Sequence, residues 1–306
     1  KMAHAKKFGS RTDSDHVLDG IDLTGKKIVV TGANTGIGYE TARSLAAAGA
    51  ELVVACRSED KGKSAVDAIR KCHNDVSVEF KKLDLSSIES VKAFSKNLSW
   101  DTIDVIIGNA GLVPTNYQQT DEGIEQCVGV CHFGHFALCK LLLPRLLKSK
   151  DPRVVMVSSE SHRAPKKLNF KKFPLNETNF AVFTAYGQAK LCNVLFVNEL
   201  QRRFGDQGLN ACSLHPGTLI TTDIGRNSGL FSLLMTLISP LTKTPNQGAS
   251  TTVYCAAYIN GKDMQGAYFS HCKRGKSSAE ANDPEVAKHL WDISEAFCEE
   301  HNVANI

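Results

Sequence analysis

Tyr186 and Lys190 are the residues of this 306-residue chain whose types and spacing most directly indicate chemistry. They lie four positions apart in the segment 184–204, where apolar residues recur at helical spacing, so both side chains are predicted on one helix face. A free tyrosine keeps its proton until about pH 10. A neighbouring ammonium favours the phenolate and lowers the pKa of the phenol, so the pair could transfer a proton near neutral pH.

Two serines, Ser158 and Ser159, directly follow the apolar run Val154 to Val157, which is a predicted strand. In an open parallel sheet, ligands bind outside the carboxyl ends of the strands. A hydroxyl at that place could donate a hydrogen bond to a carbonyl oxygen and stabilise developing alkoxide charge. The alternative is a capping role in a turn or helix, which is common for serine at a strand end.

The run from Thr31 to Gly38 reads Thr-Gly-Ala-Asn-Thr-Gly-Ile-Gly, between an apolar strand and a helical pattern that begins near Tyr39. Gly32 and Gly36 permit backbone angles and a close phosphate approach that a β-carbon would forbid, and Gly38 lets the helix pack on the strand. The helix N-terminus would then hold a pyrophosphate. The run predicts a dinucleotide-binding turn, and an ordinary tight turn is the alternative.

Arg57 follows the predicted strand Leu52 to Cys56, at the place where an acidic residue would accept the ribose hydroxyls of NAD. A guanidinium there suits the 2′-phosphate of NADP instead. NADP(H) is therefore favoured over NAD(H). An exposed arginine without a ligand is the alternative, since most arginines lie on the surface.

Short apolar runs alternate with helical patterns along the chain, and this alternation positions the residues named above. It predicts a single α/β domain with a Rossmann-type doubly wound parallel sheet and helices on both faces. Two helix starts are marked by sequence: Ser86 with Glu89 has the spacing of a capping box, and Asp283 precedes Pro284. The predicted strands are 28–31, 52–56, 76–80, 103–108, 154–157 and 209–213.

Residues 1–24 are predicted to form a polar N-terminal linker and residues 25–306 the domain. The chain begins with Lys1 rather than methionine, which suggests a piece of a longer protein. The segment 160–180, rich in Lys, Phe and Pro, is predicted to be a loop beside the site.

Composition excludes several classes of function. The formal charge of +4 is small and not gathered into a long run, so no nucleic-acid partner is expected. Ten cysteines without a Cys-x-x-Cys pair indicate reduced thiols in the cytoplasm. No apolar run reaches the roughly 20 residues that span a bilayer. The apolar run Leu230 to Leu241 predicts either a cover for a lipophilic substrate, with peripheral membrane contact, or a lid packed on the core.

These features together resemble the short-chain dehydrogenase/reductase family, from Gly25 to about Cys298. The matching motifs are the glycine motif at 31–38, Asp84 on the adenine side, Asn109-Ala110-Gly111, the Tyr186 and Lys190 pair, and Pro216-Gly217 through Thr221. Ser159 aligns with the family's catalytic serine. The resemblance implies cofactor contacts from Gly32, Asn34, Thr35, Gly36, Ile37, Gly38, Arg57, Asp84, Asn109, Ala110, Gly111, Tyr186, Lys190, Pro216, Gly217 and Thr221.

By this resemblance the chain is expected to be an NAD(P)-dependent oxidoreductase acting on small lipophilic carbonyls or alcohols, steroid- or retinoid-like. Tyr186 would protonate the carbonyl oxygen while NADPH delivers hydride, Ser159 would position that oxygen, and Lys190 would assist Tyr186 and hold the nicotinamide ribose. The gap of 27 residues between Ser159 and Tyr186 exceeds the usual family spacing and resembles the retinol dehydrogenase-like branch.

One position departs from the family. The asparagine that helps hold a water against the catalytic lysine, partly by its backbone carbonyl, aligns with Cys131, which could weaken the proton relay. Cys127, Cys131 and His135 share a helix face, but the outer two lie about 12 Å apart along a helix, whereas zinc ligands lie about 2 Å from the ion. No metal is therefore predicted.

The segments 157–163, 190–193 and 247–255 resemble more closely those family members in which two WW modules precede the reductase domain. Binding of Pro-Pro-x-Tyr proteins would belong to those modules, and localisation could extend to the nucleus, mitochondrion or Golgi. A homodimer through the helices carrying Leu141 to Leu147 and Leu191 to Leu200 is also implied.

Two other readings of the function stay open. One is a weakly active or inactive reductase fold that serves as a signalling scaffold, because relatives are linked to apoptosis. The other is a nucleotide-sugar epimerase, which shares the Tyr-x-x-x-Lys spacing, but the glycine spacing of 31–38 argues against it.

Overall fold

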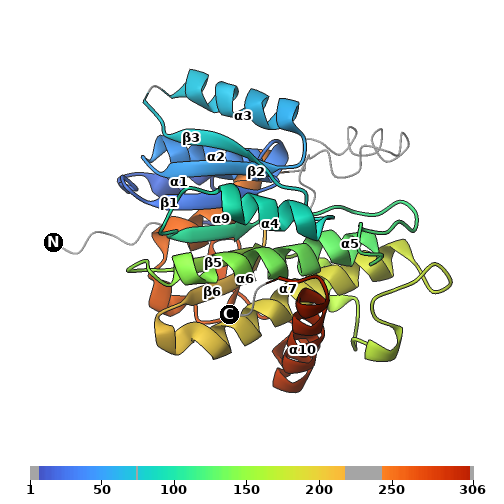
Figure 1. The fold of residues 1–306 in the computed structure, drawn as a ribbon. Helices are drawn as coiled ribbons and strands as arrows, with labels where there is room; N and C mark the ends of the chain where they lie inside the picture. Colours follow the sequence, from blue (N-terminus) through green and yellow to red (C-terminus); the bar gives the residue numbers. More distant parts are fainter. Residues whose placement is uncertain (1–6, 74, 218–242, 304–306) are drawn as a thin grey trace, which may run out of the picture.

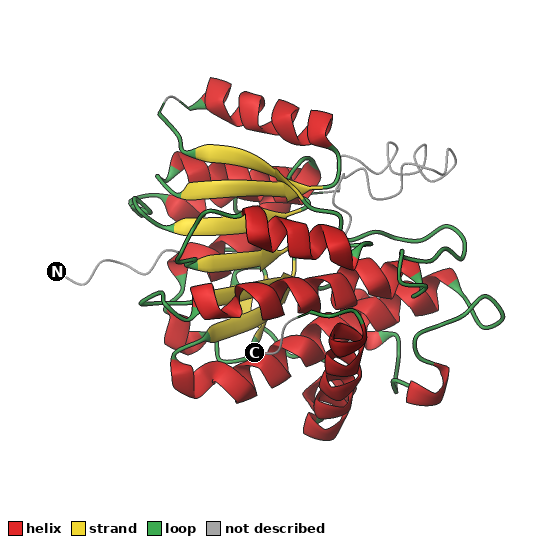
Figure 2. Ribbon diagram, viewed as in Figure 1, coloured by secondary structure: helices red, strands yellow, loops and turns green. Residues whose placement is uncertain are grey.

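One eight-stranded sheet organises the protein in the computed structural model, which describes residues 7–73, 75–217 and 243–303 (Figure 2). The strand order is β3-β2-β1-β4-β5-β6-β7-β8, and all neighbours are parallel except β7 and β8. The predicted doubly wound α/β fold is confirmed. The strands are β1 (Lys27–Thr31), β2 (Glu51–Cys56), β3 (Val78–Lys82), β4 (Val105–Gly108), β5 (Arg153–Val157), β6 (Asn210–His215), β7 (Tyr268–Ser270) and β8 (Lys273–Arg274).

Helices cover both faces of the sheet (Figure 1). They are α1 (Ser14–Leu18), α2 (Gly36–Ala47), α3 (Glu59–Cys72), α4 (Ile88–Asn97), α5 (Gln126–Val128), α6 (Gly134–Leu146), α7 (Val182–Phe204), α9 (Pro245–Val253) and α10 (Pro284–Glu300). Two π-helical turns, at Gly129–Phe133 and Tyr254–Tyr258, continue α5 and α9. Short 3₁₀ turns lie at Glu160–Arg163, Phe170–Lys172, Gly205–Gln207, Gly261–Asp263 and Glu280–Asn282.

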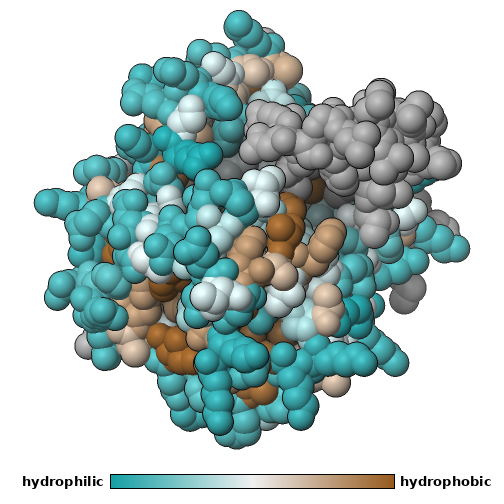
Figure 3. Space-filling model, turned by 90° about the vertical axis from the view of Figure 1, so that its right-hand side faces the viewer, coloured by the Kyte–Doolittle hydropathy of each residue, from teal (hydrophilic) through white to brown (hydrophobic). Residues whose placement is uncertain are grey.

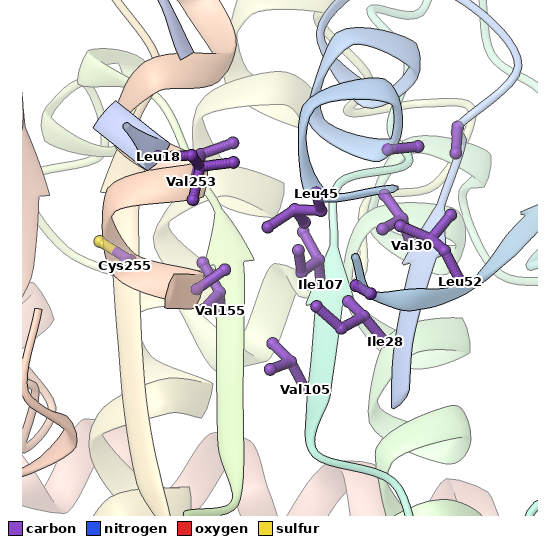
Figure 4. Packing of buried hydrophobic residues seen from close by; sticks show 14 of the residues in the cluster. Leu18, Ile28, Val30, Leu45, Leu52, Val105, Ile107, Val155, Val253 and Cys255 are labelled. Carbon is purple, nitrogen blue, oxygen red and sulfur yellow. The ribbon is translucent and has the colours of Figure 1, made fainter. Parts of the chain in front are cut away.

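The strands alternate between two cores, because successive side chains of a strand point to opposite faces. Ile28, Val30 and Ile107 pack with α1, α2 and α9 on one face (Figure 4). Val29 and Ile106 pack with α4, α6 and α7 on the other face. Both faces are apolar, which explains the continuous apolar character of the central strands.

The strand order reverses between β1 and β4, which are neighbours in the sheet although two strands and three helices separate them in sequence. The chain first adds β2 and β3 on one side of β1 and then β4 to β7 on the other. A parallel sheet has its ligand crevice outside the carboxyl ends of the strands at this reversal. The candidate site is therefore expected at the ends of β1 and β4.

The six predicted strands all exist, with shifted ends. The largest shift is in β3, predicted over 76–80 and found at Val78–Lys82. β7 and β8 carried no prediction, because three and two residues are too few for a recognisable pattern.

The N-terminal segment differs from the predicted linker. Within it, α1 packs on α2 and α9, and Phe8, Val17 and Leu18 are buried. Ser14 donates its backbone N–H to Asn246, at a distance of 2.7 Å. Residues 8–23 therefore pack against the domain, and the few apolar residues responsible are too widely spaced to show a period.

The two predicted helix starts have different outcomes. The Asp283 carboxylate accepts hydrogen bonds from the backbone N–H groups of Glu285 and Val286, which confirms it as the N-cap of α10. The capping box at Ser86 and Glu89 is wrong. α4 begins after Ser87, and its first N–H donates to Glu122, which lies 34 residues further along the chain.

Helix α10 crosses α6 and α7 (Figure 1). Its Trp291 stacks on Phe196, with ring centroids 6.1 Å apart, and meets Phe136 edge-on at 4.9 Å. On the same helix, Ser294 lies 2.8 Å from the imidazole of His132, and Glu295 forms an ion pair with Lys140. The chain's own C-terminal helix thus occupies part of the helix face predicted for a homodimer.

One helical run, 126–146, is long and apolar enough by composition to cross a membrane, which the sequence reading did not anticipate. However, 83% of its most apolar window is buried inside the protein, as in the core helix of a soluble protein. The run Leu230 to Leu241 and Thr221 lie outside the described residues.

Candidate active site

The carboxyl ends of the parallel strands meet on one face of the molecule, onto which Figure 3 looks directly. Apolar side chains gather near the middle of this face and polar ones surround them. The glycine turn after β1, Asn109 after β4 and Ser159 after β5 all begin at this edge.

The glycine turn after β1 has the backbone that its residue types predict. Gly32 and Gly36 have φ values of +64° and +59°, the left-handed region that glycine occupies without strain. A β-carbon on Gly32 would lie 2.9 Å from the Cα of Ala110. One on Gly38 would lie 2.4 Å from both the Gly32 carbonyl oxygen and the Asn109 amide nitrogen. These two positions therefore accept only glycine without a shift of backbone.

A hydrogen-bond network behind the turn joins three elements through the hydroxyl of Thr31. This oxygen accepts the backbone N–H groups of Asn109 and Ala110, at 3.0 and 2.9 Å. The Asn109 side chain in turn donates to the Thr31 carbonyl oxygen at 2.9 Å. The Asn-Ala-Gly motif thus fixes the glycine turn from behind and leaves its outer surface open.

His135 completes this network, and no sequence signal predicted its role. Its Nδ1 lies 3.1 Å from the carbonyl oxygens of Val130 and Cys131, so Nδ1 carries the proton and Nε2 accepts from the Thr31 hydroxyl at 2.8 Å. Burial lowers the pKa of His135 to about 4, so the imidazole is neutral at physiological pH. Through its two ring nitrogens, His135, in the first turn of α6, thus joins the π-helical turn to the glycine turn.

The N-terminus of α2 at Gly36 fits a phosphate group. Its first turn holds no acidic residue, so the unpaired N–H groups at the helix start present a positive field. The glycines at 32 and 36 let a ligand approach the backbone, and Asn34, Thr35 and Ile37 are not buried in the core. The residues present therefore fit the diphosphate of a dinucleotide.

The two serines after β5 have different roles. Ser158 is buried and donates its hydroxyl to the Lys190 carbonyl oxygen at 2.7 Å, so it joins β5 to α7. Ser159 is half-buried, and its hydroxyl accepts the N–H of Ser161 at 3.2 Å. His162 holds the Ser159 carbonyl oxygen from Nδ1, at 2.7 Å. Of the pair, only Ser159 has its hydroxyl at the open end of the strand. There it also caps the turn Glu160–Arg163, the alternative role that the sequence left open, and donates to the Ser161 hydroxyl at 3.3 Å.

Tyr186 and Lys190 lie one turn apart on α7, as predicted, with the Lys190 ammonium 5.6 Å from the centre of the Tyr186 ring. Lys190 is 4% exposed and donates to the Val157 carbonyl oxygen at 3.2 Å. A β-carbon on Gly187 would lie 3.1 Å from the Ser161 carbonyl oxygen. The turn that follows Ser159 therefore packs directly beside Tyr186, and the three predicted catalytic residues share one corner of the site.

Lys190 also faces two cysteines. Burial disfavours its charge, but electrostatic interaction, with Cys131 first and then Tyr186, raises the pKa of the ammonium overall. A β-carbon on Gly111 would lie 3.2 Å from both the Cys131 sulfur and the Lys190 nitrogen. Cys131 thus stands beside the lysine.

Several other predicted contacts lie near this edge, and no bound ligand tests them. Pro216 and Gly217 follow β6 and are buried, and Arg57 is exposed directly after β2. Asp84 follows β3, and its carboxylate accepts the N–H and hydroxyl of Ser86 at 3.0 and 2.6 Å. Within the described ranges, no three His, Cys, Asp or Glu side chains are arranged to hold a metal ion.

Residues 26–171 match the family model described as short chain dehydrogenase. The WW domain-containing oxidoreductase of Gallus gallus is 40% identical, over 96% of this chain and 73% of that protein. Retinol dehydrogenase 12 of Mus musculus is 41% identical, over 90% of this chain and 86% of its own length.

Solved structures agree with the fold. A Mycobacterium paratuberculosis protein described as putative and uncharacterized superposes with a TM-score of 0.75 at 33% identity, covering 92% of this chain and 97% of its own. A short chain dehydrogenase of Escherichia coli CFT073, solved in complex with NADPH, has a TM-score of 0.63 at 22% identity, over 81% of this chain and 97% of its own.

Proposed function

This chain belongs to the short-chain dehydrogenase family of oxidoreductases, and we propose that it transfers hydride between NADP(H) and a lipophilic carbonyl or alcohol. The family fold implies a nicotinamide cofactor, which supplies or accepts the hydride when it is bound. What supports the finer proposal is the corner formed by Ser159, Tyr186 and Lys190, because it combines a hydroxyl, a phenol and an ammonium at the open strand ends.

In the reducing direction, the Tyr186 hydroxyl gives its proton to the oxygen of the substrate carbonyl as negative charge develops there. The Ser159 hydroxyl donates a hydrogen bond to the same oxygen and fixes its position. Lys190 keeps a positive charge 5.6 Å from the Tyr186 ring, which compensates the phenolate left after proton transfer. In the oxidising direction each residue acts in reverse.

The preference for NADP(H) rests on Arg57, which is exposed directly after β2 and free of acidic neighbours at positions 56 and 58. A guanidinium can bind a 2′-phosphate with two parallel hydrogen bonds. The NADPH complex of the Escherichia coli relative supports the same cofactor. Replacing Arg57 with alanine is expected to weaken NADPH binding more than NADH binding.

The lipophilic substrate class is supported by the apolar side chains in the middle of the strand-end face (Figure 3) and by the name of the retinol dehydrogenase relative. Retinoid- or steroid-like carbonyls and alcohols are the compounds to assay first. Single-turnover reduction of a panel of such carbonyls by NADPH would measure the activity directly.

The test of the mechanism is Tyr186→Phe, which removes the proton donor and keeps the ring. We expect turnover to fall by about 10²- to 10⁴-fold with NADPH affinity unchanged. Tyr258→Phe is the matched control, because this tyrosine packs on Phe8 in the other core. Retained turnover in Tyr186→Phe would refute the assigned role. NADPH binding with no reduction of any compound in the wild type would refute the activity and favour a scaffold.

A further inference from the structure

Cys131 is a buried thiol at the site that the proposed reaction does not use. It lies in the π-helical turn Gly129–Phe133 and is 0% exposed. A β-carbon on Gly111 would lie 3.2 Å from the Cys131 sulfur and 3.2 Å from the Lys190 nitrogen. The sulfur and the nitrogen are therefore no further apart than twice this distance. Apart from residues 110–112, no other atom of the described residues lies within 4 Å of that β-carbon position.

The polar neighbours of this sulfur are hydrogen-bond donors. They are the backbone N–H of Leu112, the Cys127 thiol, which also donates to the Leu112 carbonyl oxygen at 3.4 Å, and, by charge, the Lys190 ammonium. Lys190 in turn is almost wholly buried, with the neutral Val157 carbonyl oxygen as its hydrogen-bond acceptor. A buried ammonium is costly unless an opposite charge accompanies it.

The other titratable groups around Cys131 and Lys190 are Tyr186, His135 and Glu125. Tyr186 faces Lys190 from the same helix, and it is the phenol that must exchange a proton. His135 is neutral. Glu125 accepts the backbone N–H groups of Cys127 and Val128. Burial and the repulsion from a negative charge on Cys131 raise the pKa of this carboxyl group, so of the groups around the pair Glu125 is the one that opposes a thiolate.

We propose that Cys131 is a positioning residue whose sulfur, as a thiolate held by Cys127 and Leu112, is the counter-ion that keeps Lys190 charged beside Tyr186. The proposal rests on the proposed function only for its catalytic consequence. A thiolate here would perform electrostatically what the family asparagine performs through hydrogen bonds. The donors around the sulfur lower the pKa of Cys131, whereas the hydrogen bond with Cys131 and burial raise that of Cys127, and burial raises that of Cys139.

The direct experiment is a pH titration of thiolate ultraviolet absorbance on the purified protein, without substrate. The difference between wild type and Cys131→Ser is expected to show a thiolate that forms below the usual range of a free cysteine. Cys139→Ser is the matched control, since Cys139 is a buried thiol in α6 among apolar neighbours, and its removal should leave that step in place. Lys190→Met should move the step to higher pH.

Lys190→Arg keeps the positive charge, so thiolate absorbance should rise near the same pH as in the wild type. This variant provides a second measurement if Lys190→Met does not fold. A difference spectrum with no step in the acidic or neutral range would overturn the proposal. So would a step that is unchanged in a folded Lys190→Met protein. Neither result depends on turnover, so failure of this inference is distinguishable from failure of the proposed function.

The catalytic consequence is read from the pH profile of kcat. Without the thiolate, Lys190 loses its proton at lower pH, so Cys131→Ala should shift the alkaline limb of kcat down by about one pH unit. Cys139→Ala should not shift it. A Cys131→Ala profile of reduced height but unchanged shape would show a merely structural role and contradict the proposal.

Discussion

The glycine turn and the α10 contacts are two regions of the same molecule that depend on sequence in different ways. In the glycine turn, backbone approaches backbone so closely that a β-carbon on Gly38 would lie 2.4 Å from the Gly32 carbonyl oxygen. In the α10 contacts, aromatic side chains such as Trp291 and Phe196 fill a space between helices. The first geometry dictates residue type, whereas the second is met by any set of side chains that fills the volume.

The difference explains why the sequence revealed one region and not the other. A position that only glycine can occupy leaves a recognisable motif in the sequence, whereas a packed aromatic cluster does not. It also predicts that the two regions respond differently to mutation: changes in α10 should affect the free energy of unfolding, and changes in the glycine turn should affect ligand binding as well.

The largest effect is expected from Trp291→Ala in α10. Trp291 is 5% exposed and contacts Phe136, Phe196 and the Arg203 guanidinium, so its removal should cost about 3–5 kcal/mol of unfolding free energy. Denaturant unfolding measures this loss, and NADPH affinity of the folded variant should not change. Phe183→Ala, at an 86% exposed position, should change stability by less than about 0.5 kcal/mol. Equal losses at the two positions would show that α10 is not part of the cooperative core.

The next effect is a pH dependence of stability through His135. Burial lowers the pKa of this imidazole from 6.5 to about 4, so between these values the unfolded chain binds a proton that the folded chain does not. Its contribution is complete above pH 6.5 and is lost as the pH falls towards 4, by about 3 kcal/mol. His135→Gln should flatten the wild-type dependence in this range, as followed by denaturant unfolding at several pH values. An unaltered slope in His135→Gln would mean that other groups carry the dependence.

Gly38→Ala tests the glycine turn itself. The added methyl group would displace Asn109 or the Gly32 carbonyl, at a cost of about 1–3 kcal/mol, and should weaken NADPH binding by at least tenfold. Fluorescence titration with NADPH and denaturant unfolding measure the two effects. Gly9→Ala, where a β-carbon meets nothing within 4 Å, is the control. If Gly38→Ala binds NADPH with wild-type affinity, the glycine turn does not differ from the α10 contacts in its effect on ligand binding.

The smallest effects are expected at the two helix starts that the sequence predicted, Asp283 for α10 and Ser86 with Glu89 for α4. Asp283→Ala removes a formed N-cap of α10 and should cost about 1 kcal/mol. Glu89→Ala removes no cap, only an exposed ion pair with Lys92, and should cost less than about 0.5 kcal/mol. Thermal or denaturant unfolding distinguishes the two. A larger loss for Glu89→Ala would mean that the predicted capping box does form in solution.

The sequence predicted a doubly wound parallel sheet, six of its strands, the backbone angles of Gly32 and Gly36 and the close packing at Gly38, because these follow from periodicity and from backbone sterics. It placed Tyr186, Lys190 and Cys131 by spacing and resemblance. It did not predict the bond between His135 and Thr31, which joins residues 104 positions apart, or the donors around Cys131. Such contacts depend on how distant elements meet, and no local pattern records them. The homodimer, the membrane contact and the cellular location stay predictions.

Because α10 follows the sheet and the helices that it covers in the sequence, it is synthesised after them. Every strand of the sheet and both helices that α10 covers leave the ribosome before Trp291 does. Until then, the apolar rings of Phe136 and Phe196 lack their partner and are open to wrong associations. Chains interrupted before Pro284 would keep this surface exposed, so they are the products that chaperones and proteases should recognise.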